Sequence, residues 1–437
     1  MTKGILLAIT LALPRLATAQ EHGLSECIEQ AIESNFSIKI KRNSARMAAN
    51  DARVNPLLPS IEASARQNQA INNTMNRASG GAETSATGAR TNTATASVAL
   101  NWRIFDGLDM FIARDRLGVL ETMGELALQQ GIESLVVEVC SLYYNVVVQQ
   151  YRLAATKHTL ELSHERYEDA QFRYGIGKIS GLEAKQAIVD LHADSSAYTR
   201  QQEQLKNAYI TLDKVMNIDL QRDAYVNDTI TMGAPLHPGE LEKNTIENNK
   251  LLVIARGERR VSDLDYKRAR AALFPTVDFT SGYNYSRTST PASTTTLARA
   301  NGFYWGFYVN VPLFNRMQNR MRARNAHLEA ENKEWTYREI EKELLGDLAL
   351  LYNAYESNLL MLNFEQEGAT IAENNLNEAL AMFKLGALSG IDFRQFQQSY
   401  INAVDRKFSA MYQAKMSELS LLLVSGQVQN LLVTTND

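Results

Sequence analysis

One turn motif occurs twice in this chain, and the two copies lie 209 positions apart. The first reads Arg-Tyr-Gly-Ile-Gly-Lys-Ile-Ser-Gly-Leu-Glu over 173–183, and the second reads Met-Phe-Lys-Leu-Gly-Ala-Leu-Ser-Gly-Ile-Asp over 382–392. The same offset relates the pattern Asn-x-x-x-Phe-Asp at 101–106 to Asn-x-x-x-Phe-Asn at 310–315. An internal repeat of this length predicts that one structural unit is used twice.

Proline defines where long helices are possible. The chain has eight prolines, and none lies between positions 60 and 234 or after 312. Proline breaks helix interiors, so these stretches permit very long helices. Three-four spacing of apolar residues predicts four of them, over 108–174, 181–216, 316–383 and 391–424. The longest would measure ~100 Å at 1.5 Å per residue, and we expect such helices to pack as antiparallel coiled coils.

Four shorter segments have a period of two. Apolar and polar residues alternate clearly over 93–102 and 302–313, and more weakly over 277–285 and 61–65. Alternation with one apolar face predicts a half-buried strand. The two clearer segments are about 9–11 residues long, which matches a tilted membrane strand.

A polar stretch rich in Gly, Ser and Thr joins the two strands of each repeat, at 72–92 and at 286–300. This composition predicts exposed hairpin loops. Each half is then expected to run helix, strand hairpin, long helix, tight turn and long helix.

The N-terminal residues 1–19 have the features of a secretory signal peptide. Lys3 is followed by a short apolar stretch and by the small residues Ala17-Thr18-Ala19. We therefore predict a signal peptide at 1–19, a first repeat at 20–216, a connector at 217–245, a second repeat at 246–427 and a tail at 428–437. The first repeat contains a strand hairpin at 59–105 and a turn at 174–183. The second contains a strand hairpin at 275–314 and a turn at 383–392.

Charge and hydropathy restrict the partners and the membrane topology. The formal net charge is −4, and removing the signal peptide with Lys3 and Arg15 changes it to −6, which argues against nucleic acid as a partner. Beyond the signal peptide we expect no apolar segment of the roughly 18 residues that a membrane helix needs. If the mature chain spans a membrane, strands are expected to do so. Cys27 and Cys140 are predicted to be buried free thiols.

The turn motif itself explains several of its residues through helix capping. Its glycine can adopt the left-handed conformation that ends a helix, and its serine can cap the returning helix. The acid three residues later completes a capping box. In the two copies these residues are Gly177, Ser180 and Glu183, and Gly386, Ser389 and Asp392. A functional role for Asp392 in addition to capping stays open.

The chain lacks the residue patterns of common enzymes. There is no Gly-rich phosphate loop, no nucleophile elbow and no pair of carboxylates in a cleft-like context. The six histidines show no metal-ligand spacing. We therefore expect no catalysis, no cofactor and no metal site.

The duplicated strand-hairpin and long-helix pattern behind a signal peptide resembles the TolC family of outer-membrane efflux proteins, over essentially the whole mature chain. The matching segments are the two turns with the residues that follow them (173–187 and 383–395), Leu-Pro-Ser and Phe-Pro-Thr entering strands (58–60 and 274–276), and Ile-Phe-Asp-Gly and Leu-Phe-Asn-Arg leaving them (104–107 and 313–316).

The resemblance implies an α+β membrane protein. Its long antiparallel coiled-coil helices would form a periplasmic α-barrel, and each protomer would contribute four β-strands to a 12-stranded transmembrane β-barrel shared by a homotrimer. Four strands cannot close a barrel, and open strand edges are not tolerated in lipid. The residues themselves thus require only an oligomer, and the number three comes from the resemblance.

The resemblance also implies a function. It describes an exit duct in the outer membrane of a Gram-negative bacterium, extending into the periplasm and gated at its helical tip, in a tripartite efflux or type I secretion system. Its implied partners are outer-membrane lipid, a periplasmic adaptor (a membrane fusion protein) and, through the adaptor, an inner-membrane pump of the RND or ABC type.

In that family the two turns lie at the periplasmic tip, where the adaptor docks and an aperture opens. The resemblance assigns the aperture to Asp392, Glu183 and Gln395. It assigns adaptor docking to Gly175, Gly177, Lys178, Leu385, Gly386 and Leu388. Gln395 stands where the family carries a second acid and Leu388 where it carries a basic residue, so whether the family's salt-bridge lock operates here stays open.

Two other features allow alternative interpretations. Basic residues flank the second strand pair, at 256–270 and 316–324, and either form a solvated helical face or contact phospholipid head groups at the periplasmic rim. Trp102 and Trp305 suit an interfacial aromatic belt, although packing against a neighbouring protomer is also possible.

The competing function is a periplasmic coiled-coil scaffold or adaptor without a pore, in which the alternating segments form a soluble sandwich. Phe303, Trp305, Phe307 and Val309 would face lipid in a barrel but a protein core in a sandwich. A further alternative keeps the duct and changes its cargo from small molecules to polypeptides.

Overall fold

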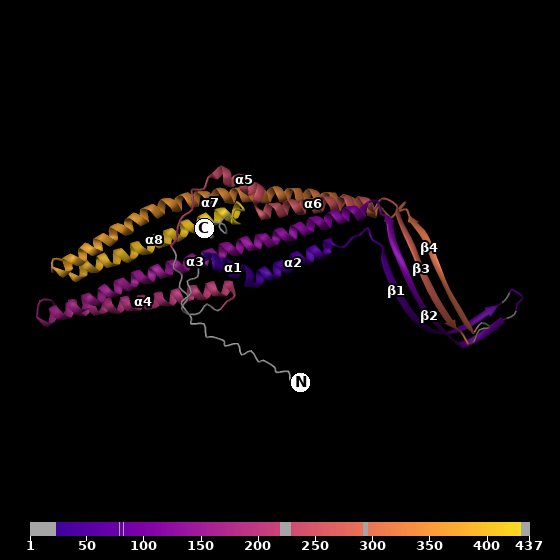
Figure 1. Ribbon diagram of the computed structural model, residues 1–437, viewed down its shortest axis with the longest axis horizontal. Coiled ribbons are helices and arrows are strands. Elements are labelled where there is room, and N and C mark those ends of the chain that lie inside the picture. Colours follow the sequence, from indigo (N-terminus) through magenta and orange to yellow (C-terminus); the bar gives the residue numbers. More distant parts are fainter. Residues whose placement is uncertain (1–22, 78, 82, 219–228, 292–295, 430–437) are drawn as a thin grey trace, which may run out of the picture. The chain divides into compact units, whose positions relative to one another are not determined.

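The computed structural model describes residues 23–77, 79–81, 83–218, 229–291 and 296–429 (Figure 1). The predicted signal peptide and most of the predicted tail lie outside the described residues. The elements are α1 (Leu24–Ser34), α2 (Phe36–Ala52), β1 (Ser60–Arg77), β2 (Glu83–Phe105), α3 (Asp109–Gly175), α4 (Gly181–Met216), α5 (Pro238–Asn248), α6 (Lys250–Ala271), β3 (Thr276–Ser289), β4 (Leu297–Asn310), α7 (Gln318–Lys384) and α8 (Gly390–Val424).

The chain forms two compact units, and each unit takes segments from both sequence repeats. The helical unit lies within 1–43, 127–253 and 341–437, and the sheet unit comprises 44–126 and 254–340. The long helices α3 and α7 contribute residues to both units. Equivalent segments of the two repeats thus share a unit, although they lie far apart in the sequence.

The four predicted long helices are confirmed. Helix α4 has the predicted bounds, and the ends of α3, α7 and α8 lie within two residues of the prediction. Absence of proline and three-four apolar spacing are local properties, which is why sequence alone locates these helices well.

The single helix expected before each strand pair is wrong, because an asparagine divides it into two. Asn35 separates α1 from α2, and Asn249 separates α5 from α6. The side-chain oxygen of Asn35 accepts the N–H of Ser37 at 2.8 Å, and that of Asn249 accepts the N–H of Leu252 at 3.1 Å. Each asparagine thus ends one helix and caps the next.

The same two asparagines also tie the start of each repeat to its end. The side-chain nitrogen of Asn35 donates to the carbonyl of Val215 near the end of α4, at 2.9 Å. That of Asn249 donates to the carbonyl of Val424 at the end of α8, at 2.8 Å. The side chains therefore pair with two of the carbonyls that a helix C-terminus leaves without partners. Both junctions share the sequence Glu-x-Asn, at 33–35 and 247–249, but the break between helices was not predicted from it.

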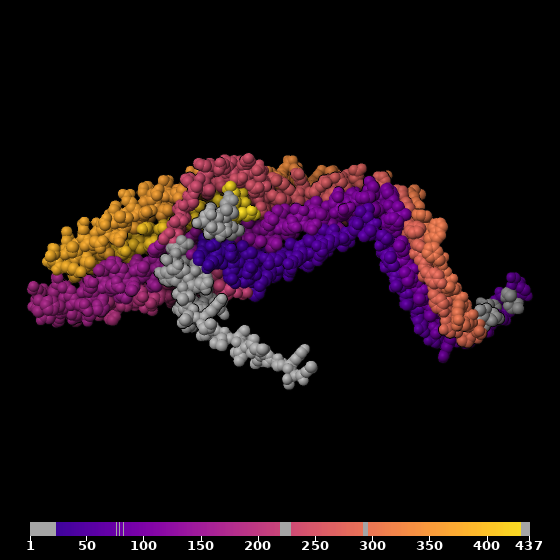
Figure 2. Space-filling view, viewed as in Figure 1, coloured from indigo at the N-terminus to yellow at the C-terminus, as the bar shows by residue number. Residues whose placement is uncertain are grey.

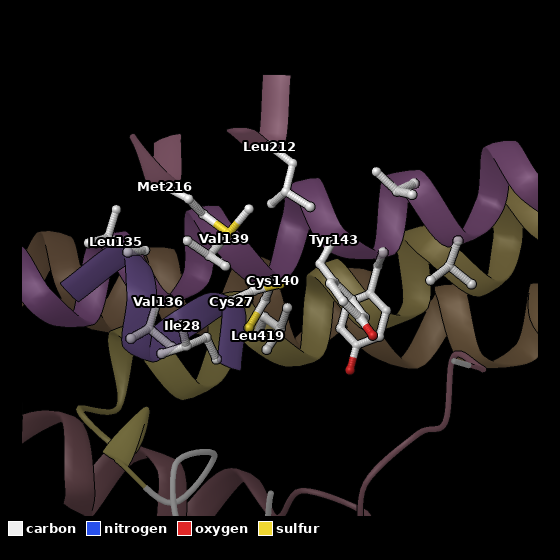
Figure 3. Packing of buried hydrophobic residues seen from close by; sticks show 14 of the residues in the cluster. Cys27, Ile28, Leu135, Val136, Val139, Cys140, Tyr143, Leu212, Met216 and Leu419 are labelled. Atoms are coloured by element: carbon white, nitrogen blue, oxygen red, sulfur yellow. The ribbon is translucent and has the colours of Figure 1, made fainter. Parts of the chain in front are cut away.

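The core of the helical unit is built from α1, α3, α4 and α8 (Figure 3). Buried side chains labelled there include Ile28 of α1, Val139 of α3, Leu212 of α4 and Leu419 of α8. Burying such a side chain stabilises the fold by about 1.5–3 kcal/mol. This packing joins both helices of the first hairpin, α3 and α4, to α1 and to α8 of the second hairpin.

Cys27 and Cys140 both belong to this core and are free thiols. Burial is the main cause that raises the pKa of each thiol to about 12. Both cysteines therefore stay protonated at neutral pH, when their reactive thiolate form is essentially absent.

Helix α3 contains one stretch that is long and apolar enough to cross a membrane by length and composition, with a mean hydropathy of 1.4. The expectation that no such segment follows the signal peptide is therefore wrong. The reason lies in packing, because 61% of that stretch is buried inside the structure. The middle of α3 is covered on several sides by the core, so it is apolar on more than one face.

The sheet unit contains one four-stranded antiparallel sheet in the order β1-β2-β3-β4. Its strands are longer than predicted. The polar stretches expected to be loops are largely paired strand, since Asn72 pairs with Ala89 and Ser289 with Leu297. Polar composition alone does not end a strand, because Thr, Ser and Asn backbones continue the hydrogen-bond ladder. Strand β4 ends at Asn310, two residues before Pro312, which has no N–H to donate.

Candidate functional site

The strand register gives the sheet one apolar face. Val277 pairs with Val309, Phe279 with Phe307 and Tyr283 with Phe303 across β3 and β4. Residues paired across strands point to the same side of a sheet, and side chains alternate along each strand. The resulting apolar face consists of Ile61, Ala63 and Ala65 of β1, Val98, Leu100 and Trp102 of β2, Val277, Phe279 and Tyr283 of β3, and Phe303, Trp305, Phe307 and Val309 of β4.

This apolar face is open to the surroundings. The side chains of Phe303, Trp305 and Phe307 are 68%, 64% and 62% exposed. Within the part of the chain that the structure describes, no second sheet exists to cover them. A soluble protein rarely exposes so large a contiguous apolar surface, so the geometry disfavours the sandwich alternative.

The opposite face of the same sheet is polar. Arg103 of β2 and Asp278 of β3 form an ion pair at 2.9 Å, and Ser64 and Ser97 form a hydrogen bond of 2.9 Å between their hydroxyls. Tyr308, next to Phe307, lies on this face. A sheet with one apolar and one polar side suits a wall between lipid and water.

Both edges of the sheet are unpaired among the residues that the structure describes. β1 has only β2 as a neighbour, and β4 has only β3. Each edge therefore presents a row of backbone N–H and C=O groups without partners from the described residues. In a membrane such groups cost several kcal/mol each, so a sheet of this kind in lipid needs further strands to cover its edges.

The two repeated turns have the same backbone geometry. Gly177 and Gly386 have positive φ values of 72° and 76°. The N–H of Lys178 donates to the carbonyl of Arg173 at 2.8 Å, and the N–H of Ala387 donates to that of Met382 at 2.9 Å. Together with a second bond from each glycine N–H, this is the Schellman pattern that closes a helix C-terminus.

The serine of each turn caps the returning helix. The Ser180 hydroxyl oxygen accepts the N–H of Glu183 at 3.3 Å, and the Ser389 hydroxyl oxygen accepts the N–H of Asp392 at 3.1 Å. The Ser389 hydroxyl also donates to the Asp392 carboxylate at 2.7 Å. The capping box predicts that this carboxylate reaches the serine's backbone N–H, whereas here it contacts the hydroxyl. Asp392 is exposed, as are Glu183 and Gln395.

Buried charges join the two helical hairpins a few turns away from the tip. The side chain of Arg166 on α3 is 4% exposed, and its guanidinium forms an ion pair with Asp190 of α4 and donates to the carbonyl of Gly390 at 2.9 Å. Arg394 of α8 donates two hydrogen bonds to Asp194 of α4, at 2.5 and 2.8 Å. Burial acts to lower the pKa of Arg394, but the hydrogen bonds to Asp194 and the negative charges of Asp194 and Asp190 together outweigh it, so the pKa is raised.

None of these four charged residues was predicted from the sequence, because the contacts of Arg166 with Gly390 and of Arg394 with Asp194 join segments that are distant in sequence. One indication was available. Asp190 and Asp194 are one helical turn apart on α4, so both acids lie on one face. In this structure the charges that hold the two hairpins together thus come from within the helices, and the exposed acids of the turns do not take part.

Two aromatic side chains pack together within the second turn, and an arginine of the first turn lies over one of them. Phe383 stacks on Phe393 with ring centroids 5.2 Å apart, and the Arg173 guanidinium lies over the Phe383 ring at 5.4 Å. Leu388 packs against this cluster and is half-buried. By contrast, Leu385 is 85% exposed.

A cleft of about 390 Å³ lies between the two hairpins near their turns, which lie side by side in Figure 2. Of the predicted tip residues it is lined by Lys178, Glu183, Gly386, Leu388 and Ser389. Gly175, Gly177, Leu385, Asp392 and Gln395 lie outside its lining. Among the described residues no three His, Cys, Asp or Glu side chains come together in a way that could hold a metal ion.

Comparison with known proteins gives a consistent result. Residues 241–427 match the protein family described as "Outer membrane efflux protein". The chain is 20% identical over 336 residues to the "Probable outer membrane lipoprotein SilC" of Salmonella typhimurium, covering 73% of this chain and 71% of that protein. It is 25% identical over 300 residues to the "Outer membrane protein OprJ" of Pseudomonas aeruginosa, covering 64% of this chain and 59% of that protein.

Solved structures share the fold over nearly the whole chain. The structure of CusC superposes with a TM-score of 0.76 at 16% identity, covering 93% of this chain and 92% of that one. The Campylobacter jejuni CmeC outer membrane channel superposes with a TM-score of 0.76 at 16% identity, covering 92% of this chain and 85% of that one. The long helical hairpins and the four-stranded sheet are therefore a shared architecture.

Proposed function

The chain is a member of the outer membrane efflux protein family, the TolC family, and from that premise we propose that it forms an exit duct in the outer membrane of a Gram-negative bacterium. In this proposal the strands cross the membrane and the long helices extend into the periplasm. The protein catalyses no reaction and conducts its cargo through a central pore.

The observation that carries this proposal is the two-faced sheet with two unpaired edges. An apolar outer face contacts lipid, and the polar face lines a water-filled lumen. Closing the barrel requires the edges β1 and β4 to pair with neighbouring copies. We propose a homotrimer, in which three sheets of four strands make a 12-stranded barrel. The segments 20–216 and 246–427, joined by 217–245, act in it as two repeats of one design.

The tip formed by the two turns is the proposed gate. Asp392, Glu183 and Gln395 are assigned to the aperture. Three copies of Asp392 around a narrow axis would repel anions and attract cations. The exposed carboxylate of Asp392, fixed by the Ser389 hydroxyl, supports this assignment.

The outer surface of the tip is the proposed docking site for a periplasmic adaptor, which couples the duct to an inner-membrane pump of the RND or ABC type. The residues assigned to docking are Gly175, Gly177, Lys178, Leu385, Gly386 and Leu388. Leu385 and Lys178 are the most informative of these to change, because both are exposed. Leu388 is less informative, since it also packs against the cluster that contains Phe383 and Phe393.

Planar-bilayer conductance of the detergent-purified mature protein tests the duct. We expect discrete current steps from a species that runs as an oligomer on an unheated gel. A soluble protein that neither partitions into membranes nor conducts would overturn the proposal in favour of a periplasmic scaffold.

Adaptor docking is tested separately, in cells that depend on the duct for export. Lys178→Glu and Leu385→Asp are expected to impair export while leaving the oligomer and its bilayer conductance intact. Normal export by both variants would remove these residues from the docking surface. Export assays with small molecules and with a secreted polypeptide would then distinguish an efflux duct from a secretion duct.

A further inference from the structure

Two arginines lie opposite each other on β3 and β4, near the end of these strands where the chain passes from β3 to β4. Arg287 of β3 and Arg299 of β4 are direct partners in the strand register, and both are exposed. Within the described residues neither forms an ion pair or a hydrogen bond through its side chain. Like charges placed directly opposite each other destabilise a strand pair, so an anion bound between the two arginines would stabilise it.

The register places both arginines on the apolar face of the sheet. Arg287 lies two residues beyond Tyr285 and four beyond Tyr283, and Arg299 lies four residues before Phe303. Side chains alternate along a strand, so positions separated by even numbers share a face. The arginines therefore lie where the apolar face ends, at the strand ends remote from α6 and α7.

We propose that Arg287 and Arg299 together bind the phosphate-bearing headgroup of a lipid in the membrane leaflet at that end of the strands. The proposal rests on the proposed function, because it requires the apolar face to lie in a membrane.

The chemistry favours a phosphate group. A guanidinium presents paired N–H donors that match two phosphate oxygens, and two guanidinium groups can share one doubly charged phosphate. The residue opposite Arg287 on β2 is Ala94, whose small side chain leaves room beside the pair. A bound phosphate also removes the repulsion between the two arginines.

The adjoining surface favours a lipid over a free anion. Tyr285, 41% exposed, lies directly next to the arginines on the same face, in the position of an interfacial aromatic residue. Beyond it the face continues with Tyr283, Phe303 and Trp305. An amphiphile bound here places its phosphate on the arginines and its acyl chains on the aromatic side chains, whereas inorganic phosphate uses only the arginines.

The test is a binding titration of the detergent-purified oligomer with diphosphorylated lipid A, with the same lipid after removal of its phosphates, and with inorganic phosphate. The variants are Arg287→Gln, Arg299→Gln and the double variant. Arg66→Gln is the matched control, because Arg66 of β1 is also exposed and pairs with Thr95, next to Ala94, but lies on the polar face.

We expect each single variant to bind diphosphorylated lipid A about fivefold more weakly, and the double variant roughly 30-fold more weakly, since one arginine near a charged membrane surface contributes about a factor of five. Arg66→Gln is expected to bind like the unmodified protein. Lipid without phosphates is expected to bind like the double variant.

Three results would overturn the inference. They are unchanged binding by the double variant, an equal loss in Arg66→Gln, or inorganic phosphate displacing the lipid from the site, which would make it a site for free anions. Conductance and the unheated gel band, measured on the same preparations, separate this failure from failure of the duct. A protein that conducts normally but binds lipid A independently of the arginines refutes only the lipid site.

Discussion

Phe307 and Tyr308 are neighbours on β4 that differ in the face of the sheet they occupy. Their side chains are almost equally exposed within one chain, at 62% and 63%. If the apolar face contacts lipid, Phe307→Arg places a charge in hydrocarbon, whereas Tyr308→Arg places it in the lumen. We predict that the first substitution strongly destabilises the membrane-inserted protein and that the second does not.

The magnitude follows from the position of Phe307. It lies near the middle of the apolar face on β4, and an arginine at mid-depth of a bilayer costs about 2–4 kcal/mol per copy. Its ring centroid also lies 5.1 Å from that of Phe279 and 6.3 Å from that of Trp305, and losing such ring contacts costs roughly 0.5–1.5 kcal/mol each. The free energy of unfolding should therefore fall by about 3–7 kcal/mol per copy.

The assay is urea unfolding of the protein in lipid vesicles, followed by tryptophan fluorescence, with the heat-resistant oligomer band as a second measure. Phe307→Ala serves as a control that removes the ring without adding a charge. Tyr308→Arg is expected to stay within about 1 kcal/mol of the unmodified protein. In a soluble scaffold that leaves both positions exposed, the added charge costs little at either position, so Phe307→Arg would stay within about 0.5 kcal/mol of Phe307→Ala. Equal effects at the two positions, or a larger loss at Tyr308, would refute the assignment of the faces.

Three further changes probe the helical unit. Asp392→Ala is expected to raise single-channel conductance if the carboxylate narrows the aperture, whereas unchanged conductance with about 1 kcal/mol less stability would leave it only a capping role. Arg394→Gln leaves Asp194 largely buried without its ion-pair partner and should lower the free energy of unfolding by about 3 kcal/mol; a urea midpoint equal to that of the unmodified protein would contradict this. Burial raises the pKa of Glu133, against the lowering effect of nearby Lys250. The stability that this carboxyl contributes is therefore fully present below its unfolded pKa of about 4.3. It is lost as the pH rises through the higher pKa of the folded state. Glu133→Gln removes that dependence and should gain stability relative to the unmodified protein between pH 4 and 7, as urea midpoints at the two pH values would show; a constant difference would argue against it.

The features that sequence predicted well are those set by local pattern. The bounds of α4 follow from Ser180 at its start and from the apolar spacing along it. The strand alternation around Phe303 and Trp305 also identified the apolar face. The shared fold of known structures agrees with the α+β architecture expected from the resemblance.

The features that sequence did not predict depend on contacts between distant segments. Asn35 ends a helix because its side chain pairs with the carbonyl of Val215, and nothing within α1 or α2 shows that partner. The same holds for the pair between Arg394 and Asp194, which joins the two repeats. The prediction that the polar strand ends are loops was wrong for another reason. Pairing between β1 and β2 uses backbone N–H and C=O groups, which amino-acid composition does not describe.

The two asparagine junctions connect the beginning of each half of the chain to the end of the same half. In each half the first helix pair is fastened to the last carbonyls of the same half, by Asn35 to Val215 and by Asn249 to Val424. The connector keeps the two halves at high effective concentration, and it also contacts α8, because the N–H of Gly233 donates to the Glu418 carboxylate at 3.2 Å. Two separate half-length chains would retain both fastenings. A ring with twice as many subunits, each contributing one strand pair, would contain the same strands as the duplicated chain.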